Sequence, residues 1–230
     1  MPSPETIDSA VVRDRIARNL AGIHRRIADA AARTGRDAAL VRLIAVTKTV
    51  GLAEIEALCA AGVGEMAENR VEVAQPKIAA GPKDIVWHMI GPLQTRKAAE
   101  VVTAFSHFDA IDRVRAAEAL QRRCEEQNRS LRVLVEVNVS GEASKHGFEP
   151  TDLPQALAEM RGFDRLHLDG LMTMAPFGAG DAFLRKCFRK LKQLADNHGL
   201  TELSMGMTDD FETAIEEGAT QVRIGRALFE

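Results

Sequence analysis

The hydrophobic residues of this chain follow two alternating periodic patterns. Residues 8–35 place apolar side chains three or four positions apart, which predicts a helix that Asp8 or Ser9 can cap. After it, short runs rich in β-branched residues alternate with runs of helical periodicity. The predicted strands are 42–48, 63–68, 85–90, 108–112, 131–139, 168–174, 202–205 and 220–224. The predicted helices are 51–61, 70–79, 94–104, 113–128, 153–160, 183–198, 208–217 and 226–229.

Eight strand–helix units in 230 residues predict an α/β protein, a single (β/α)₈ TIM barrel with an extra N-terminal helix over 8–35. An open, doubly wound sheet is the alternative, since alternation alone does not prove closure. No repeat, linker or low-complexity tract divides the chain, so we expect one domain over residues 1–230.

The composition narrows the class of protein. A formal net charge of −3 without a basic patch argues against nucleic acid as a partner. Cys59, Cys124 and Cys187 are far apart and show no disulfide or zinc-site spacing, which favours a reducing cytoplasm and no metal. We expect no export signal and no membrane span, because no run approaches about 18 apolar residues. We also expect a monomer.

Candidate chemistry gathers at the predicted C-terminal ends of the strands. Lys48 ends the first strand. In barrels of this type, the loops after strands seven and eight hold phosphate groups. These loops contain Ser204, Gly206, Met207, Thr208 and Gly225. A lysine that faces a phosphate-binding loop is what pyridoxal phosphate requires, because its aldehyde needs an amine and its phosphate needs backbone donors.

Simpler interpretations exist for these residues. A lysine at a strand end is usually a solvated charge, and Thr208 before two aspartates is a good helix cap. His88 in an apolar strand is typical of a satisfied core histidine, although it can line a cofactor pocket. Met172 serves equally as pocket wall or as core. Lys145 follows the fifth strand and is a surface-loop lysine or, alternatively, a transient acceptor of the cofactor.

Four blocks of sequence resemble the pyridoxal phosphate homeostasis protein family, whose fold is similar to the N-terminal barrel of alanine racemase. The blocks are LIAVTKT at 43–49, WHMIGPLQTRK at 87–97, GLMTM at 170–174 and SMGMTDDFETAIEEGATQVRIG at 204–225. The resemblance implies pyridoxal 5′-phosphate bound covalently, as a Schiff base, on Lys48. It implies a phosphate held by Ser204, Thr208 and Gly225, with Arg223 beside the pyridine nitrogen. Asn69 is implied to lie near the ring.

The chain departs from the family pattern twice. It has Met66-Ala67-Glu68-Asn69 where the family usually has Phe-Gly-Glu-Asn, and it stops at Phe229-Glu230 without the usual glycine. The first departure removes the backbone freedom of a glycine, and the second affects the closing turn.

The residues argue for binding over turnover. Arg223 is permanently cationic, so beside the pyridine nitrogen it disfavours a second proton there and weakens the electron sink. Its alternative is an ion pair between barrel layers. Racemisation in alanine racemase also uses a tyrosine, and this chain contains none. We therefore predict a non-enzymatic carrier in vitamin B6 homeostasis that buffers pyridoxal phosphate or delivers it to apo-enzymes. A low-activity racemase or lyase, or a barrel enzyme acting on another phosphorylated substrate, are the alternatives.

Overall fold

The computed structural model describes residues 9–142 and 145–230, whose strands form a closed parallel barrel. Each strand pairs with the next in sequence, and the last pairs with the first, with Ile44 opposite Arg223. The predicted barrel is therefore confirmed, and the open doubly wound alternative is wrong. The strands are β1 Arg42–Val46, β2 Glu65–Glu68, β3 Val86–Met89, β4 His107–Ile111, β5 Leu131–Glu136, β6 Leu166–Met172, β7 Glu202–Ser204 and β8 Gln221–Ile224.

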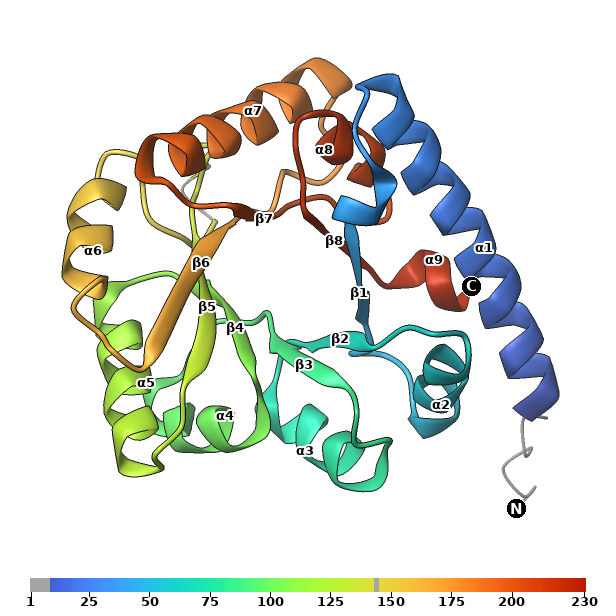
Figure 1. The fold of residues 1–230 in the computed structure, drawn as a ribbon, viewed down its shortest axis with the longest axis horizontal. Coiled ribbons are helices and arrows are strands. Elements are labelled where there is room, and N and C mark those ends of the chain that lie inside the picture. The colour runs from blue at the N-terminus through green and yellow to red at the C-terminus, as the bar shows by residue number, and fades with distance from the viewer. Residues whose placement is uncertain (1–8, 143–144) are drawn as a thin grey trace.

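Helices surround the ring of strands on its outside (Figure 1). Their buried faces are the apolar stripes that the sequence places at helical spacing. The helices are α1 Ser9–Arg33, α2 Leu52–Ala60, α3 Val71–Ala80, α4 Ala98–Ala104, α5 Val114–Glu126, α6 Leu153–Met160, α7 Asp181–His198, α8 Phe211–Glu216 and α9 Arg226–Phe229. Short 3₁₀ turns at Ala38–Leu40 and Thr95–Lys97 precede β1 and α4. Among the described residues, no helix has the length and apolarity that crossing a membrane requires.

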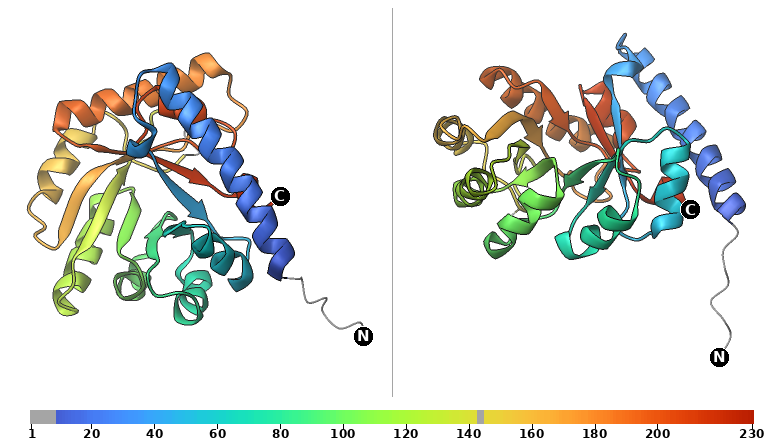
Figure 2. Two further views of the ribbon diagram at one scale, coloured as in Figure 1. Left: turned by 45° about the vertical axis from the view of Figure 1, so that its right-hand side comes forward. Right: turned by 60° about the horizontal axis from the view of Figure 1, so that its bottom comes forward.

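The extra N-terminal helix α1 packs along the outside of the barrel against α2, α8 and α9 (Figure 2). Val12, Ile16 and Leu20 belong to its fully buried stripe. Asn19 donates to the carbonyl oxygens of Leu228 and Glu230 at 3.0 and 2.8 Å, so α1 holds the end of the chain in place without the family's usual glycine. The predicted cap Asp8 lies outside the described residues.

Two predicted element boundaries near the mouth of the barrel are wrong. β1 ends at Val46, because the carbonyl of Thr47 accepts the amide of Val50 at 3.1 Å and the chain turns. Lys48 therefore lies in the turn after the strand and not within it. The helix predicted from residue 208 begins at Phe211, and residues 208–210 form a turn in which Asp210, not Thr208, occupies the capping position.

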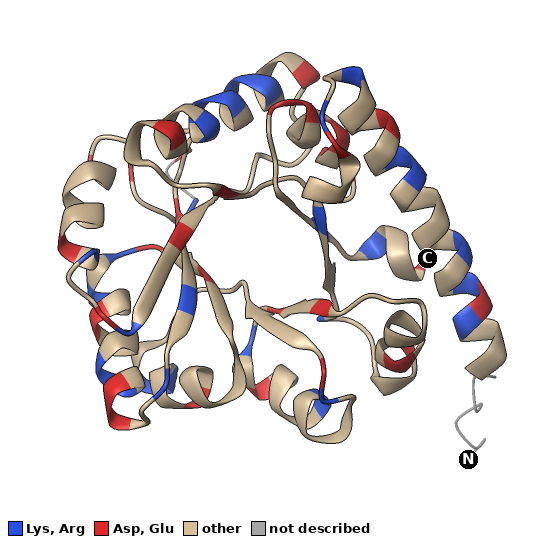
Figure 3. Cartoon of the chain, in the orientation of Figure 1, with Lys and Arg blue, Asp and Glu red and all other residues tan. Residues whose placement is uncertain are grey.

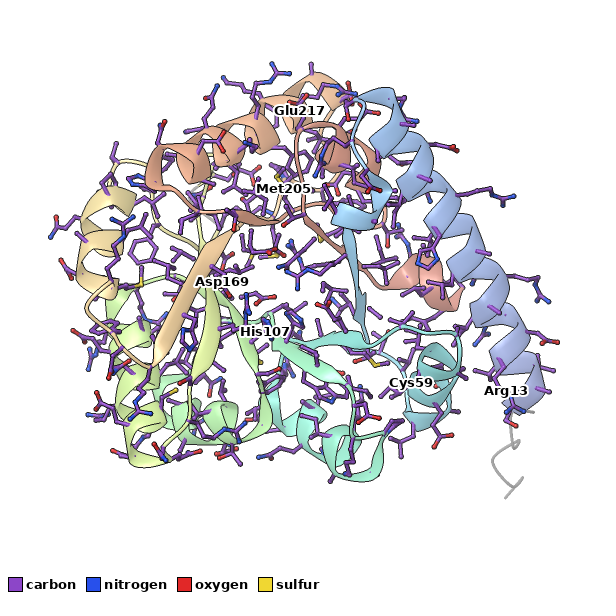
Figure 4. The ribbon with its side chains drawn as sticks, viewed as in Figure 1. Arg13, Cys59, His107, Asp169, Met205 and Glu217 are labelled. Atoms are coloured by element: carbon purple, nitrogen blue, oxygen red, sulfur yellow. The ribbon has the colours of Figure 1, made fainter. Side chains whose placement is uncertain are left out.

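Side chains of alternating strand positions fill the barrel (Figure 4). Ile44, Val46 and Ala67 form a small apolar cluster there, separate from the main core between strands and helices. Ala67 is the position where the family usually has glycine. It lies fully buried in β2, and Asn128 is the only non-glycine residue with positive φ in the described chain. The substitution therefore requires no glycine-like backbone.

Candidate functional site

Lys48 lies at the C-terminal mouth of the barrel, where it is exposed and makes no hydrogen bond or ion pair in the described structure. It follows Val46 by two positions, and Val46 faces the barrel interior. The preceding residue is firmly held: Lys77 donates to the Thr47 carbonyl at 2.7 Å and to Glu68 at 2.6 Å. The Thr47 hydroxyl also donates to Glu68, at 2.8 Å. The unpaired Lys48 amine is thus attached to a turn whose position is fixed by hydrogen bonds.

Arg223 is the buried cation of the mouth, with only 4% of its surface exposed. Its Nη1 donates to the Ser204 hydroxyl at 2.7 Å and its Nη2 to the Thr173 carbonyl at 2.9 Å. Within the described ranges no carboxylate comes within ion-pair distance, so the predicted alternative of an ion pair between barrel layers is not what the geometry shows. Burial lowers the pKa of Arg223, against the opposing charges of Asp109 and Glu136. The guanidinium therefore has no carboxylate in direct contact, although the charges of Asp109 and Glu136 act on it.

The loop after β7 is shaped by Gly206. Its φ is +92°, and a Cβ there would lie 2.6 Å from the Ala214 Cβ and 2.9 Å from the Phe211 Cα. Only glycine fits both constraints. The next amide, of Met207, donates to the Asp210 carboxylate at 2.6 Å, so it is engaged within the loop. Burial raises the pKa of Asp210, although the hydrogen bond from Met207 opposes that shift.

The two predicted phosphate loops lie side by side. Arg226, at the start of α9, donates to both oxygens of Asp209 in the loop after β7, at 2.6 and 2.7 Å. Thr208 and Gly225 are half-buried in these loops. Ser204 is fully buried, and its hydroxyl faces Arg223. A pocket of about 220 Å³ adjoins the loop after β7. It is lined by Ala175, Pro176, Phe177, Gly178, Ala179, Leu184, Met207, Asp209 and Asp210.

Asn69 and Met172 come from other strand ends of the same mouth. Asn69 directly follows β2 and is half-buried, and its backbone is so close to Gly91 that a Cβ there would lie 2.1 Å from the Asn69 carbonyl oxygen. Met172 is fully buried at the end of β6, where it pairs in register with Ser204. It therefore forms part of the barrel filling beneath the mouth. Their contacts with a cofactor stay predictions.

His88 lies inside the barrel as a satisfied core histidine. Its Nδ1 is 2.9 Å from Asp109 Oδ2 and its Nε2 is 3.2 Å from Glu65 Oε2, while its ring stacks on that of His107 at 4.2 Å (labelled in Figure 4). Burial lowers the pKa of His88, but the two carboxylates outweigh burial and raise it to about 9. Burial and the charge on His88 lower the pKa of His107 to about 4. Since both His88 nitrogens are engaged, a role in holding a cofactor stays a prediction.

Glu136 is a residue of the mouth that sequence reasoning missed. It ends β5, is only 3% exposed, and pairs in register with Met172. Its carboxylate has no hydrogen bond or ion pair in the described part of the chain. The signal was present, because a single glutamate interrupts the valine-rich run 131–139.

The arrangement suits an aldehyde-bearing aromatic phosphate. The unpaired amine of Lys48 supplies a nucleophile, and the buried guanidinium of Arg223 offers N–H donors to a ring nitrogen. Gly206 lets the loop after β7 pack closely on α8, and the role of this loop in holding a phosphate stays a prediction. No group of histidine, cysteine or acidic residues suited to a metal occurs in the described ranges.

Comparison with known proteins identifies the fold and the family. The family model for the alanine racemase N-terminal domain matches residues 14–230. An alanine racemase of Clostridium difficile superposes with a TM-score of 0.76 over 94% of this chain and 56% of that chain, and at 14% identity it supports the fold alone. The chain is thus an alanine racemase N-terminal-domain barrel. It belongs to the pyridoxal phosphate homeostasis protein family. The family member from Pseudomonas aeruginosa is 41% identical over 219 residues, 93% of this chain and 94% of that protein.

Solved structures agree with this assignment. An unknown protein from Bifidobacterium adolescentis has a TM-score of 0.92 at 33% identity, covering 98% of both chains. PipY of Synechococcus elongatus, in a structure with pyridoxal phosphate bound, has a TM-score of 0.80 at 33% identity, covering 94% of this chain and all of that chain.

Proposed function

We propose that this protein binds pyridoxal 5′-phosphate as a Schiff base on Lys48 and serves vitamin B6 homeostasis by buffering or delivering it. The observation that carries the proposal is a pair of unpaired cations at one mouth, the exposed Lys48 amine and the buried Arg223 guanidinium. An anionic cofactor with a carbonyl and a ring nitrogen satisfies both. The relative named pyridoxal phosphate homeostasis protein and the structure of PipY with pyridoxal phosphate bound also support the proposal.

The residues around the site favour holding the cofactor over amino-acid turnover. When bound, pyridoxal phosphate withdraws electrons from an attached amine, most strongly when its ring nitrogen is protonated. Arg223 is a donor, and beside that nitrogen it disfavours the added proton. The chain also has no tyrosine to act as a second acid or base. We therefore propose a carrier, with the low-activity racemase or lyase as the alternative.

Attachment is tested with the purified protein and added pyridoxal phosphate. We expect an absorbance band in the visible or near-ultraviolet that borohydride fixes, and a peptide map that places the reduced adduct on Lys48. Lys48→Ala removes the fixed adduct, whereas Lys186→Ala, an exposed lysine of α7, leaves it unchanged. A colourless native protein after incubation would instead favour a barrel enzyme for another phosphorylated substrate.

Carrier and racemase are separated by two further measurements. Loaded protein should reactivate an apo-enzyme that requires the cofactor, and failure to do so reduces the proposed role to buffering. In heavy water, the carrier should exchange the Cα hydrogen of L-alanine only marginally. Exchange at enzyme-like rates that depends on Lys48 would contradict the carrier and establish the alternative.

We further propose that residues 1–230 act as one domain and that a monomer suffices. Lys48, Arg223 and the two phosphate loops all come from one chain, which supports this. Cys59, Cys124 and Cys187 are free thiols in the described structure, which supports a reducing compartment such as the cytoplasm. The proposed partners are pyridoxal phosphate and the apo-enzymes that receive it.

A further inference from the structure

Glu136 is a buried carboxylate of the mouth that neither the fold nor the proposed cofactor contacts explain. A carboxylate without a partner is costly to bury, because its desolvation is not offset by a hydrogen bond or a counter-charge. In the described chain, Glu68, Asp109 and Gln221 each have a side-chain oxygen with neither solvent access nor a hydrogen bond. Glu136 has no such oxygen, although its carboxylate also makes no hydrogen bond. Its carboxylate oxygens must therefore belong to the 3% of the residue that is exposed. It therefore retains access to the mouth.

The position of Glu136 places it across the barrel from Lys48. The strands close in the order β1 to β8, so β5 is four strands from β1 in either direction. Glu136 pairs in register with Met172, and Met172 with Ser204, whose hydroxyl binds Arg223. Paired residues of parallel strands share a face, so the Glu136 side chain faces the interior with Arg223. Lys48 and Glu136 therefore lie at the ends of opposite strands of one mouth.

The backbone around Glu136 is held by its own loop. The Phe148 amide donates to the Glu136 carbonyl at 2.8 Å. Gly147 between them has φ of +105°, and a Cβ there would lie 2.8 Å from that carbonyl oxygen. The loop therefore fixes the strand end and leaves the carboxylate free of partners.

We propose that Glu136 binds the ammonium group of an incoming primary amine and takes its first proton, so that this amine can displace Lys48 from the cofactor. The inference rests on the proposed function. A primary amine is an ammonium ion at neutral pH and is not nucleophilic until it loses a proton. An unpartnered carboxylate opposite Lys48 supplies both the counter-charge and the proton acceptor.

The exchange balances without any oxidant or reductant. A bond forms between the incoming nitrogen and the carbon that Lys48 holds, and the bond from that carbon to the Lys48 nitrogen breaks. Two protons leave the incoming nitrogen, the first to Glu136, and two arrive on the Lys48 nitrogen, which departs as an ammonium group. Glu136 ends in the protonation state in which it began.

The surroundings of Glu136 are suited to accepting a proton. Burial raises its pKa, as does Asp112 after β4, while Arg223 on β8 and His146 and Lys145 on the loop after β5 oppose the rise. A raised pKa makes the carboxylate a stronger base than an exposed glutamate.

The test uses two probes of nearly equal size, ethylamine and O-methylhydroxylamine. At pH 7 the first is cationic and the second is neutral, so only ethylamine must lose a proton before its nitrogen can attack. Loaded protein is mixed with each probe, and release from Lys48 is followed by absorbance. We expect Glu136→Gln to slow release by ethylamine about tenfold or more and to leave release by O-methylhydroxylamine within about twofold. Glu142→Gln, an exposed carboxylate of the same loop, should match the native protein for both probes.

The native protein supplies a second measurement that does not depend on the folding of a variant. If Glu136 takes the proton, the rate with ethylamine levels off above the pKa of Glu136. Without such an acceptor, the rate follows the free-amine fraction and rises about tenfold per pH unit between pH 6.5 and 8.5. Glu136→Gln should restore that rise, and Glu136→Asp should partly reverse the loss of rate.

Each result bears on one of the two proposals. Equal slowing with both probes, no slowing with either, or a tenfold rise per pH unit in the native protein overturns the role of Glu136 and leaves the proposed function standing. Absence of a borohydride-fixed adduct on Lys48 overturns the proposed function and the Glu136 inference together.

Discussion

The pairing of charged side chains differs between the two ends of the barrel. At the N-terminal end, Arg42 lies 2.7 Å from Glu202, and the neighbouring charged groups of the barrel interior are paired in the same way. At the C-terminal mouth, Lys77 is paired with Glu68 and Arg226 with Asp209, both at 2.6 Å. Lys48, Arg223 and Glu136, by contrast, have no ion pair in the described chain. Figure 3 shows charged positions on the strands of the ring as well as on its outer helices.

This difference in pairing distinguishes charged residues that stabilise the fold from charged residues that can bind a ligand. A buried ion pair is strongly destabilising to break, since the remaining charge is left uncompensated. A buried charge that already lacks its partner is instead free to meet a ligand, at a cost in stability that the rest of the fold offsets. The paired end thus supports the barrel, and the unpaired groups of the mouth are available to a ligand.

Breaking the paired end should have the largest effect. Asp109→Ala removes the partner of His88 at 2.9 Å and should lower the free energy of unfolding by about 3–5 kcal/mol. Asp169→Ala breaks the Arg132–Asp169 pair, in which Arg132 is 53% exposed, and should cost below about 1 kcal/mol. Denaturant titration measures both variants, and equal losses would contradict the distinction between buried and exposed pairs.

The charge on His88 should make stability depend on pH. Its pKa is about 9 in the folded protein against 6.5 in an unfolded chain, so its contribution is complete below pH 6.5 and is lost as pH rises through 9. The contribution amounts to about 3 kcal/mol. The difference in unfolding free energy between the native protein and His88→Gln should therefore shrink from pH 6.5 to 9.5. A difference that stays constant would mean that His88 is neutral in the fold.

At the mouth, Arg223→Leu tests whether the unpaired guanidinium serves a ligand. Hydrogen bonds from a charged group contribute about 1.5–3 kcal/mol, so we expect binding of pyridoxal phosphate to weaken about 10- to 100-fold. Absorbance titration measures the affinity, and thermal unfolding shows whether the variant is folded. A folded variant with native affinity would remove Arg223 from the proposed site.

The exposed pair between the phosphate loops should matter least. Arg226→Ala breaks the bonds to Asp209 at 2.6 and 2.7 Å, and both side chains are about half exposed. We expect a change in unfolding free energy below about 1 kcal/mol and an affinity for pyridoxal phosphate within about fivefold of native. A larger loss of affinity without a loss of stability would show that Arg226 itself contacts the phosphate.

Much of the fold was predictable because each strand and helix carries its own periodic pattern. The boundaries failed where a loop hydrogen bond ends or delays an element. The Thr47 carbonyl accepts from Val50 after β1, and the Asp210 carboxylate accepts from the Met207 amide in the turn before α8. Lys48 and the glycine loop were predicted from the motifs, and their roles stay predictions. Glu136 was missed although a glutamate in a valine-rich strand is visible in the sequence, because only the strand register and the packing show that it faces the barrel interior without a partner.

The sequence by itself determined the alternation of eight strands with helices, the extra N-terminal helix, and the residue types available for chemistry. These follow from local periodicity and composition. The tertiary structure decided that β8 closes on β1, that His88 lies between two carboxylates, and that the turn carrying Lys48 and the strand end at Glu136 lie on opposite sides of one mouth. Those facts depend on pairings between residues far apart in the chain, which no local pattern encodes.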